Sequence, residues 1–319
     1  MGRELETEVL KGVSRSFYLS LRLLPGPMRR AAGIAYLLAR TSDTIADSMV
    51  GSANERIEWL SDYLQQVRGG IPCQAFPENM YQGITDTREV NLLRSHLEIL
   101  KALRGLDSGE IKLIHEVLET IVGGQILDLE RFGKADSEPV ALKDAGELED
   151  YAWRVAGCVG LFWTRLGFLK MGRRFSRHSQ AELELWAVEY GKGLQLVNIL
   201  RDFQADRRMG RCYLPVANPQ DDPACFNEFQ KWRKVALEKV ACGRAYAGKL
   251  RGLRLPLASG LPAVIAVETL KLLDVGDLSA LEGGIKISRS RLYRLIMREC
   301  LGLFKFKPTK NRKASSLGV

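Results

Sequence analysis

The chain has 319 residues, and its 47 lysines and arginines against 38 acidic residues give a formal net charge of +9. That length can bury a sizeable core, and because no 18-residue apolar run is free of charge, we expect no transmembrane helix. The basic excess indicates an anionic partner without identifying it. Since there is no zinc-finger spacing, aromatic RNP signature or basic zipper arm, we expect no nucleic-acid partner. The acidic N-terminus is unlike a signal peptide, so we expect a cytoplasmic protein.

In chain order, apolar residues recur with helical spacing, and no strand-rich stretch interrupts them. A helix is predicted to begin at Pro27, since proline suits the first helical turn. The other predicted helices cover residues 4–13, 53–68, 88–105, 108–132, 145–171, 179–208, 226–252, 261–275 and 288–302. The pattern predicts an all-α chain with one domain over residues 1–303 and a basic, flexible tail over residues 304–319.

A stripe of polar residues marks the first long helix. Tyr36, Arg40, Asp43 and Asp47 are spaced by four, three and four residues, which places them on one helical face. Two carboxylates one turn apart repel each other, but they suit a hard divalent cation such as Mg²⁺. The alternative is a solvated helix face in which Arg40 and Asp43 pair with each other.

A second stripe repeats the pattern. Gln195, Asn198, Asp202 and Asp206 again share one helical face, and the two stripes hold the only Asp-x3-Asp spacings in the chain. Two carboxylate clusters that face each other across a cavity could grip a diphosphate through metal ions and draw charge from it as it leaves. The sequence therefore predicts a site for ionising a diphosphate ester.

Two other segments have features of a binding site. Ser14-Arg15-Ser16-Phe17 brings hydroxyls and a guanidinium together, which suits phosphate, although serines there can equally cap a helix. The small residues Ala156, Gly157 and Gly160 leave a smooth helix face. That face suits either a long apolar substrate or close helix packing.

These segments together resemble the squalene and phytoene synthase family. The resemblance rests on five motifs in the family's order: Ser14-Arg-Ser-Phe17, Tyr36-x3-Arg40-x2-Asp43-x3-Asp47, Tyr151-x4-Ala-Gly-x-Val-Gly160, Gln195-x2-Asn198-x3-Asp202-x3-Asp206 and Gly210-Arg-x-Tyr-Leu-Pro215. It implies an all-helical isoprenoid-synthase fold with a central active-site cavity. It also implies Mg²⁺-dependent head-to-head condensation of two prenyl diphosphates through a cyclopropyl diphosphate.

The resemblance also implies roles for particular residues. The metal ligands would be Asp43, Asp47, Asp202 and Asp206. The substrate would be bound by Ser14, Ser16, Phe17, Arg40, Gln195, Asn198 and Arg201. The catalytic residues would be Tyr151, Tyr36 and Arg40, with Tyr151 steering the carbocation and its proton loss. Many relatives carry one more acidic residue near the first aspartate pair, whereas this chain has Ala46 before Asp47, which implies fewer metal ligands.

The prediction of the product rests on a segment near the C-terminus. Gly283-Gly-Ile-Lys286-Ile-Ser-Arg289 resembles the stretch near the nicotinamide site of squalene synthases, so Lys286 and Arg289 are predicted to bind NADPH. The alternative is that both are surface charges at the start of a helix. The resulting prediction is squalene from two farnesyl diphosphates. The alternatives are dehydrosqualene, hydroxysqualene or phytoene formed without NADPH, and a non-catalytic family member that acts in assembly or membrane binding. The basic tail suits a peripheral contact with anionic membranes, and the alternative is a disordered tail that only aids solubility.

Overall fold

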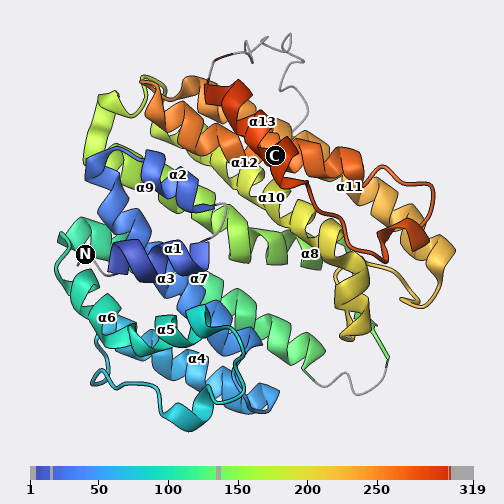
Figure 1. Ribbon diagram of the computed structural model, residues 1–319, viewed down its shortest axis with the longest axis horizontal. Coiled ribbons are helices and arrows are strands. Elements are labelled where there is room, and N and C mark those ends of the chain that lie inside the picture. Colours follow the sequence, from blue (N-terminus) through green and yellow to red (C-terminus); the bar gives the residue numbers. More distant parts are fainter. Residues whose placement is uncertain (1–4, 15–16, 134–137, 301, 303–319) are drawn as a thin grey trace.

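The computed structural model describes residues 5–14, 17–133, 138–300 and 302, and its elements form a bundle of helices (Figure 1). The first half contains η1 (Leu5–Leu10), α1 (Lys11–Ser14), α2 (Phe17–Leu23), α3 (Gly26–Asp47), α4 (Ala53–Arg68), η2 (Glu78–Met80), α5 (Thr87–Arg94), α6 (His96–Arg104) and α7 (Ser108–Phe132). The second half contains β1 (Val140–Ala141), α8 (Ala145–Ala152), η3 (Trp153–Gly157), α9 (Cys158–Met171), η4 (Gly172–Arg174), α10 (Gln180–Arg208), β2 (Arg211–Cys212), α11 (Asp222–Lys249), α12 (Arg254–Leu272), η5 (Ser279–Leu281) and α13 (Arg289–Cys300). The all-α prediction is confirmed.

Local chemistry explains where the helices begin and end. Proline occupies the first turn of α3, as its fixed φ favours. The N-terminus of α4 is closed by a capping box between Ser52 and Glu55, and its C-terminus by Gly69 in the left-handed conformation. These end signals lie in the sequence itself, which is why the bounds of α4 and α7 match the predicted ones.

Several predicted helices differ from the observed ones. The helix predicted over residues 145–171 is α8, η3 and α9 in the structure, and the one predicted over residues 226–252 is α11. Two further differences have a clear physical cause. The helix predicted over residues 88–105 is two helices, because the backbone of Ser95 departs from helical geometry (ψ 2°) and its hydroxyl donates to the Asn91 carbonyl. The helix predicted from residue 261 begins at Arg254 and contains Pro262 in its interior. Residues Ala258 to Leu261 are buried, so packing offsets the hydrogen bond that the proline removes.

The bundle is organised around α10. This helix packs against α9 on one side and α11 on another, while α3 packs against α4 and α7 (Figure 1). The approach is close at two glycines: a Cβ atom on Gly160 would lie 2.1 Å from the carbonyl oxygen of Ala187, and one on Gly191 would lie 2.3 Å from that of Ala156. Small residues are therefore needed where α9 and η3 cross α10.

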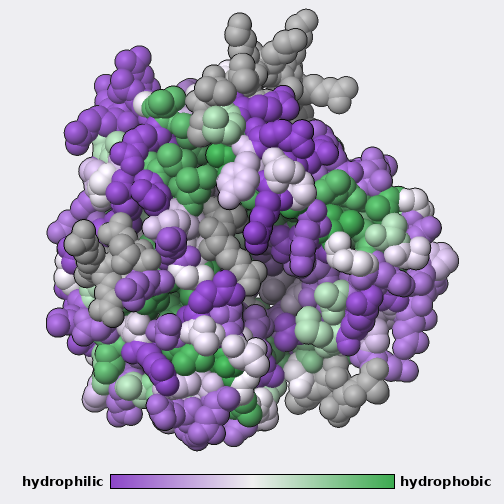
Figure 2. Space-filling model, in the orientation of Figure 1, coloured by the Kyte–Doolittle hydropathy of each residue, from purple (hydrophilic) through white to green (hydrophobic). Residues whose placement is uncertain are grey.

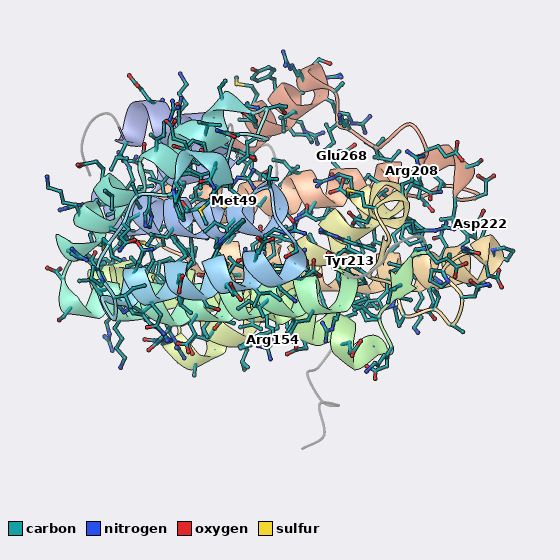
Figure 3. All side chains as sticks on the ribbon, turned by 90° about the horizontal axis from the view of Figure 1, so that it is seen from below. Met49, Arg154, Arg208, Tyr213, Asp222 and Glu268 are labelled. Carbon is teal, nitrogen blue, oxygen red and sulfur yellow. The ribbon has the colours of Figure 1, made fainter. Side chains whose placement is uncertain are left out.

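A short parallel pair of strands closes one end of the bundle. Val140 in β1 pairs with Arg211 in β2, which fixes the chain directly after α10. Tyr213, which follows β2, lies inside the bundle with 6% of its surface exposed (Figure 3). The strand pair thus holds residues 211–213 against the helices.

One helix of the described part, α12, is long and apolar enough by length and composition to cross a membrane. Of its most apolar window, however, 61% is buried inside the fold, as in the core helix of a globular domain. The face of the molecule drawn in Figure 2 is mostly hydrophilic, with hydrophobic residues in separate patches. The single domain over residues 1–303 remains a prediction, and the proposed tail lies outside the described residues.

Candidate active site

Two adjoining cavities share walls formed by α3, α7, η3 and α10. One is polar, with a volume of about 450 Å³, and the other is apolar, with a volume of about 400 Å³. Asp43, Gln195 and Asn198 line both, so the two cavities meet at these residues. A charged head group and an apolar chain of one ligand would fit such a pair of cavities.

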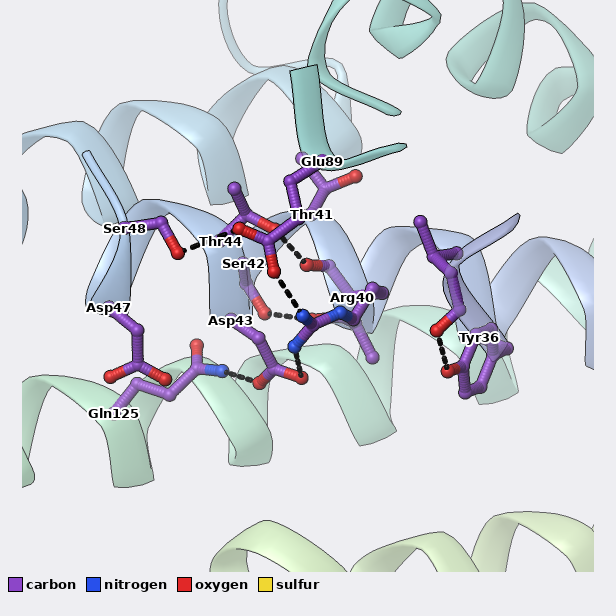
Figure 4. A network of polar contacts seen from close by, with 12 residues as sticks. Tyr36, Arg40, Thr41, Ser42, Asp43, Thr44, Asp47, Ser48, Glu89 and Gln125 are labelled. Carbon is purple, nitrogen blue, oxygen red and sulfur yellow. Dashed lines mark hydrogen bonds and ion pairs between the residues drawn. The ribbon is translucent and has the colours of Figure 1, made fainter. Parts of the chain in front are cut away.

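Three residues of the first predicted stripe line the polar cavity, namely Arg40, Asp43 and Asp47. Arg40 forms an ion pair with Asp43 at 3.6 Å and also pairs with Glu89 of α5 (Figure 4). Asp47 forms an ion pair with Arg211 at 3.5 Å. The solvated-face alternative predicted an ion pair between Arg40 and Asp43. That pair exists, but both residues lie in the wall of the polar cavity.

The second predicted stripe lines the same cavity from α10. Asn198 donates a hydrogen bond to Gln195 at 3.5 Å. Asp202 accepts two hydrogen bonds from the guanidinium of Arg201, at 2.9 and 2.5 Å. With Asp206, all of these residues lie among those lining the cavity. The fold therefore brings both acidic stripes to one cavity, although Asp43 and Asp202 are 159 positions apart in the sequence.

The acidic side chains of this cavity do not ionise like exposed ones. Loss of hydration deep in the cavity, with help from neighbouring Asp47, raises the pKa of Asp43 to about 6, against the opposing effect of Arg40. The pKa of Asp206 is raised to about 7, by burial and by the neighbouring Asp202. Burial likewise raises the pKa of Asp128 to about 6. The pKa values stay raised although Arg40, Arg201 and Arg211 form ion pairs with aspartates of this cavity. A bound cation would therefore stabilise the ionised carboxylates further.

The donor set fits a hard divalent cation. Its atoms are carboxylate and carboxamide oxygens, which are the ligands that Mg²⁺ prefers. No three Asp, Glu, His or Cys side chains within the described part of the chain come close enough to enclose an ion by themselves. Such a site matches Mg²⁺ bound by one or two carboxylates, with water and phosphate oxygens as the remaining ligands.

Aromatic side chains border the cavities. The ring of Tyr151 stacks on that of Tyr213 with centroids 4.8 Å apart, and its hydroxyl donates to that of Tyr213 at 3.4 Å. Burial raises the pKa of both phenols, so both stay neutral at physiological pH. Tyr36 lines the apolar cavity and donates to the carbonyl of Val13 at 3.1 Å. Such neutral, electron-rich rings can stabilise a carbocation nearby.

The apolar cavity extends along α3 from Asp43 to Ala32, a length of ~16 Å at the helical rise. Ala156 and Gly160 line it from the other side, as the prediction of a smooth groove required. Gly160 also lies against the backbone of Ala187. The two interpretations of these small residues, groove and close packing, therefore both apply.

Several predicted site residues lie elsewhere or are not described. Ser14 is buried in α1, where its hydroxyl donates to the carbonyl of Leu10, so it does not face the polar cavity. Ser16 and the side chain of Phe17 lie outside the described residues. Lys286 and Arg289 are exposed at the start of α13 and line neither cavity.

Four polar residues without a predicted role also line the polar cavity: Gln125, Asp128, Arg211 and Tyr213. Gln125 donates to Asp43 at 2.6 Å. Asp128 accepts from Tyr213 at 2.8 Å and forms an ion pair with Arg211 at 3.6 Å. Gln125 and Asp128 lie one turn apart in the otherwise apolar segment 121–129, and this spacing is the signal that could have identified them.

Comparison with known proteins agrees with this geometry. The family model described as squalene/phytoene synthase matches residues 10–222. A presqualene diphosphate synthase from Zymomonas mobilis is 30% identical over 63% of this chain and 56% of its own length. A bifunctional lycopene cyclase/phytoene synthase from Blakeslea trispora is 28% identical over 81% of this chain and 38% of its own length. The chain thus spans less than two thirds of the length of these relatives.

Among solved structures, the complex of TcSQS with the ligand E5700 has a TM-score of 0.76 and 22% sequence identity, covering 93% of this chain and 86% of that one. This likeness confirms the predicted isoprenoid-synthase fold. The family match covers two thirds of the chain and includes both acidic stripes. The chain belongs to the squalene/phytoene synthase family.

Proposed function

We propose that this protein condenses two molecules of farnesyl diphosphate head to head, forming a cyclopropyl diphosphate. The observation that carries this proposal is the convergence of the two acidic stripes on one polar cavity that opens into an apolar one. The polar cavity would hold the diphosphate groups, and the apolar cavity would hold the prenyl chains. The named activity of the presqualene diphosphate synthase relative supports the same reaction.

The metal ligands in this proposal are Asp43 and Asp47 on α3 and Asp202 and Asp206 on α10. Mg²⁺ bound there would neutralise negative charge that develops on the leaving diphosphate. Arg40 and Arg201, which pair with aspartates in this structure, would pair with phosphate oxygens. Gln195 and Asn198 would hold the substrate where the two cavities meet.

The reacting carbons would lie beside the aromatic residues. When the bond between C1 and oxygen breaks, the diphosphate leaves with the electron pair and an allylic cation remains. The double bond of the second molecule attacks this cation, and loss of a proton closes the three-membered ring. Tyr36 and Tyr151 would stabilise the positive charge through their ring faces, since both phenols line the cavities.

Reduction of this intermediate to squalene by NADPH remains a finer prediction. It rests on the likeness of residues 283–289 to a nicotinamide-site segment, and both Lys286 and Arg289 lie outside the cavities. Phytoene, dehydrosqualene and hydroxysqualene remain the alternative products, and the phytoene synthase part of the Blakeslea trispora relative favours the first of them. A peripheral membrane contact through the tail and a cytoplasmic location are likewise proposals.

Product analysis tests the proposal. The purified protein is incubated with farnesyl or geranylgeranyl diphosphate and Mg²⁺, with and without NADPH, and products are identified by mass spectrometry. We expect a C30 cyclopropyl diphosphate from farnesyl diphosphate without NADPH, and squalene only when NADPH is present. Turnover of geranylgeranyl diphosphate alone would assign the protein to phytoene formation. No Mg²⁺-dependent product from either substrate would contradict the proposal.

A further inference from the structure

The wall of the polar cavity formed by α7 contains two polar side chains to which no role has been assigned. Gln125 and Asp128 lie one turn apart and both face the cavity that the two acidic stripes line. Each is anchored through one atom, and each has a second oxygen that is buried. Neither of these oxygens has a hydrogen-bond partner among the described residues.

Gln125 is anchored through its amide nitrogen. Nε2 donates to Oδ1 of Asp43 at 2.6 Å, as Figure 4 shows. This bond fixes the carboxamide, and only 8% of the residue is exposed. Its Oε1 is therefore held in place as a buried acceptor without a donor.

Asp128 is anchored through Oδ2. That atom accepts the hydroxyl proton of Tyr213 at 2.8 Å and forms an ion pair with Nη1 of Arg211 at 3.6 Å. The side chain is 14% exposed, and Oδ1 has no donor among the described residues. Two fixed acceptors one turn apart thus border the carboxylates of α3.

A buried acceptor without a donor is unfavourable by about 1–3 kcal/mol, so two of them in one cavity imply a ligand that donates. An ionised diphosphate offers only acceptors and would be repelled by these oxygens. The water ligands of a divalent cation are strong donors, and Mg²⁺ usually retains several of them in proteins. We infer that Gln125 and Asp128 are outer ligands of the metal site, whose free oxygens accept hydrogen bonds from the water ligands of an ion held by Asp43 and Asp47.

This inference depends on the metal site of the proposed function, and a binding measurement separates the two. Mn²⁺ is titrated into the protein with inorganic diphosphate present, and free Mn²⁺ is measured by electron paramagnetic resonance. If the wild type binds no Mn²⁺, the proposed function itself fails. If it binds, we expect Gln125→Met to weaken binding by about 10- to 100-fold, the range found for lost outer ligands.

A second variant identifies which atom of Gln125 matters. Gln125→Glu retains an acceptor oxygen but loses the donor to Asp43, so we expect its Mn²⁺ affinity to stay well above that of Gln125→Met.

Asp128→Asn tests the second outer ligand. This variant would direct its carbonyl oxygen to the Tyr213 hydroxyl and its amide into the cavity, so it should weaken Mn²⁺ binding too. This variant retains volume and anchor, so it tests the inference even if Gln125→Met fails to fold.

Gln204→Leu is the matched control. Gln204 is a half-buried glutamine on α10 that lies outside both cavities and donates to the carbonyl of Leu278. Replacing Gln204 with leucine should leave the Mn²⁺ affinity unchanged. Wild-type affinity in both Gln125→Met and Asp128→Asn would overturn the inference. Equal weakening in Gln125→Glu and Gln125→Met would also overturn it, because the role of Gln125 would then be only to orient Asp43.

Discussion

Individual carboxylates of the polar cavity keep protons at a pH where exposed ones have lost them. The pKa of Asp43 is raised to about 6 and that of Asp206 to about 7, mainly because hydration is lost. A carboxyl group with a raised pKa in the folded state binds more protons folded than unfolded. Without metal, these groups therefore stabilise the fold less as the pH rises from about 4 through 7.

Metal binding should show the opposite pH dependence, because a cation binds the deprotonated form. We expect the increase in melting temperature caused by Mg²⁺ to grow between pH 5.5 and pH 8, with its midpoint between the two raised pKa values. Differential scanning fluorimetry with and without Mg²⁺ measures this. The double variant Asp43→Asn with Asp206→Asn should lose most of the dependence. A constant increase across this range in the wild type would contradict the assignment.

The hydroxyl of Tyr213 joins two parts of the site. It donates to Asp128 at 2.8 Å, while its ring stacks on Tyr151. Tyr213→Phe retains the stack but removes a donor from a buried carboxylate, which should lower the free energy of unfolding by about 1–3 kcal/mol. Urea denaturation measures this, with Tyr293→Phe as the control because Tyr293 is 66% exposed. Equal stability of both variants would show that the bond to Asp128 contributes nothing.

At the scale of the elements, the crossing of α9 and α10 sets the shape of the apolar cavity. A Cβ atom on Gly160 would lie 2.1 Å from the carbonyl oxygen of Ala187, and backbone cannot move aside as a side chain can. Gly160→Ala should therefore force the helices apart and lower the free energy of unfolding by at least about 1–3 kcal/mol. Thermal and urea unfolding test this.

Gly276 offers the matched control. It is exposed, and an added Cβ atom would have no neighbour within 4 Å. Gly276→Ala should leave stability unchanged or slightly higher, because alanine restricts the unfolded chain. If Gly160→Ala were as stable as this control, the contact between the two helices would be looser than the structure indicates.

The sequence predicted elements well where local signals mark them. The proline near the start of α3 and the capping box of α4 are such signals. The prediction of one helix over residues 88–105 was wrong, because the backbone bend at Ser95 divides a continuous apolar pattern into α5 and α6. The prediction of a helix start near Pro262 was also wrong, because local chemistry argues for a helix boundary there and only tertiary packing explains a helix that continues through it.

At the scale of the whole molecule, the bundle brings together residues from helices far apart in the sequence. The spacing of Asp43 and Asp47, and of Asp202 and Asp206, predicted both acidic stripes, and the structure places them on one cavity. The contribution of α7 could not be derived, because only the tertiary arrangement shows that Gln125 reaches Asp43. Ser14 was predicted to bind substrate, but its hydroxyl instead donates to the carbonyl of Leu10 at the end of η1.

The central claim is that the two acidic stripes act together on a diphosphate. The direct measurement is the rate at which inorganic diphosphate is released from farnesyl diphosphate with Mg²⁺, by the wild type, Asp43→Asn and Asp202→Asn, with the exposed Asp62→Asn as control. We predict release that requires Mg²⁺ and falls by at least about 100-fold in each cavity variant while the control keeps the wild-type rate. A folded Asp43→Asn or Asp202→Asn variant that releases diphosphate at the wild-type rate would contradict the claim.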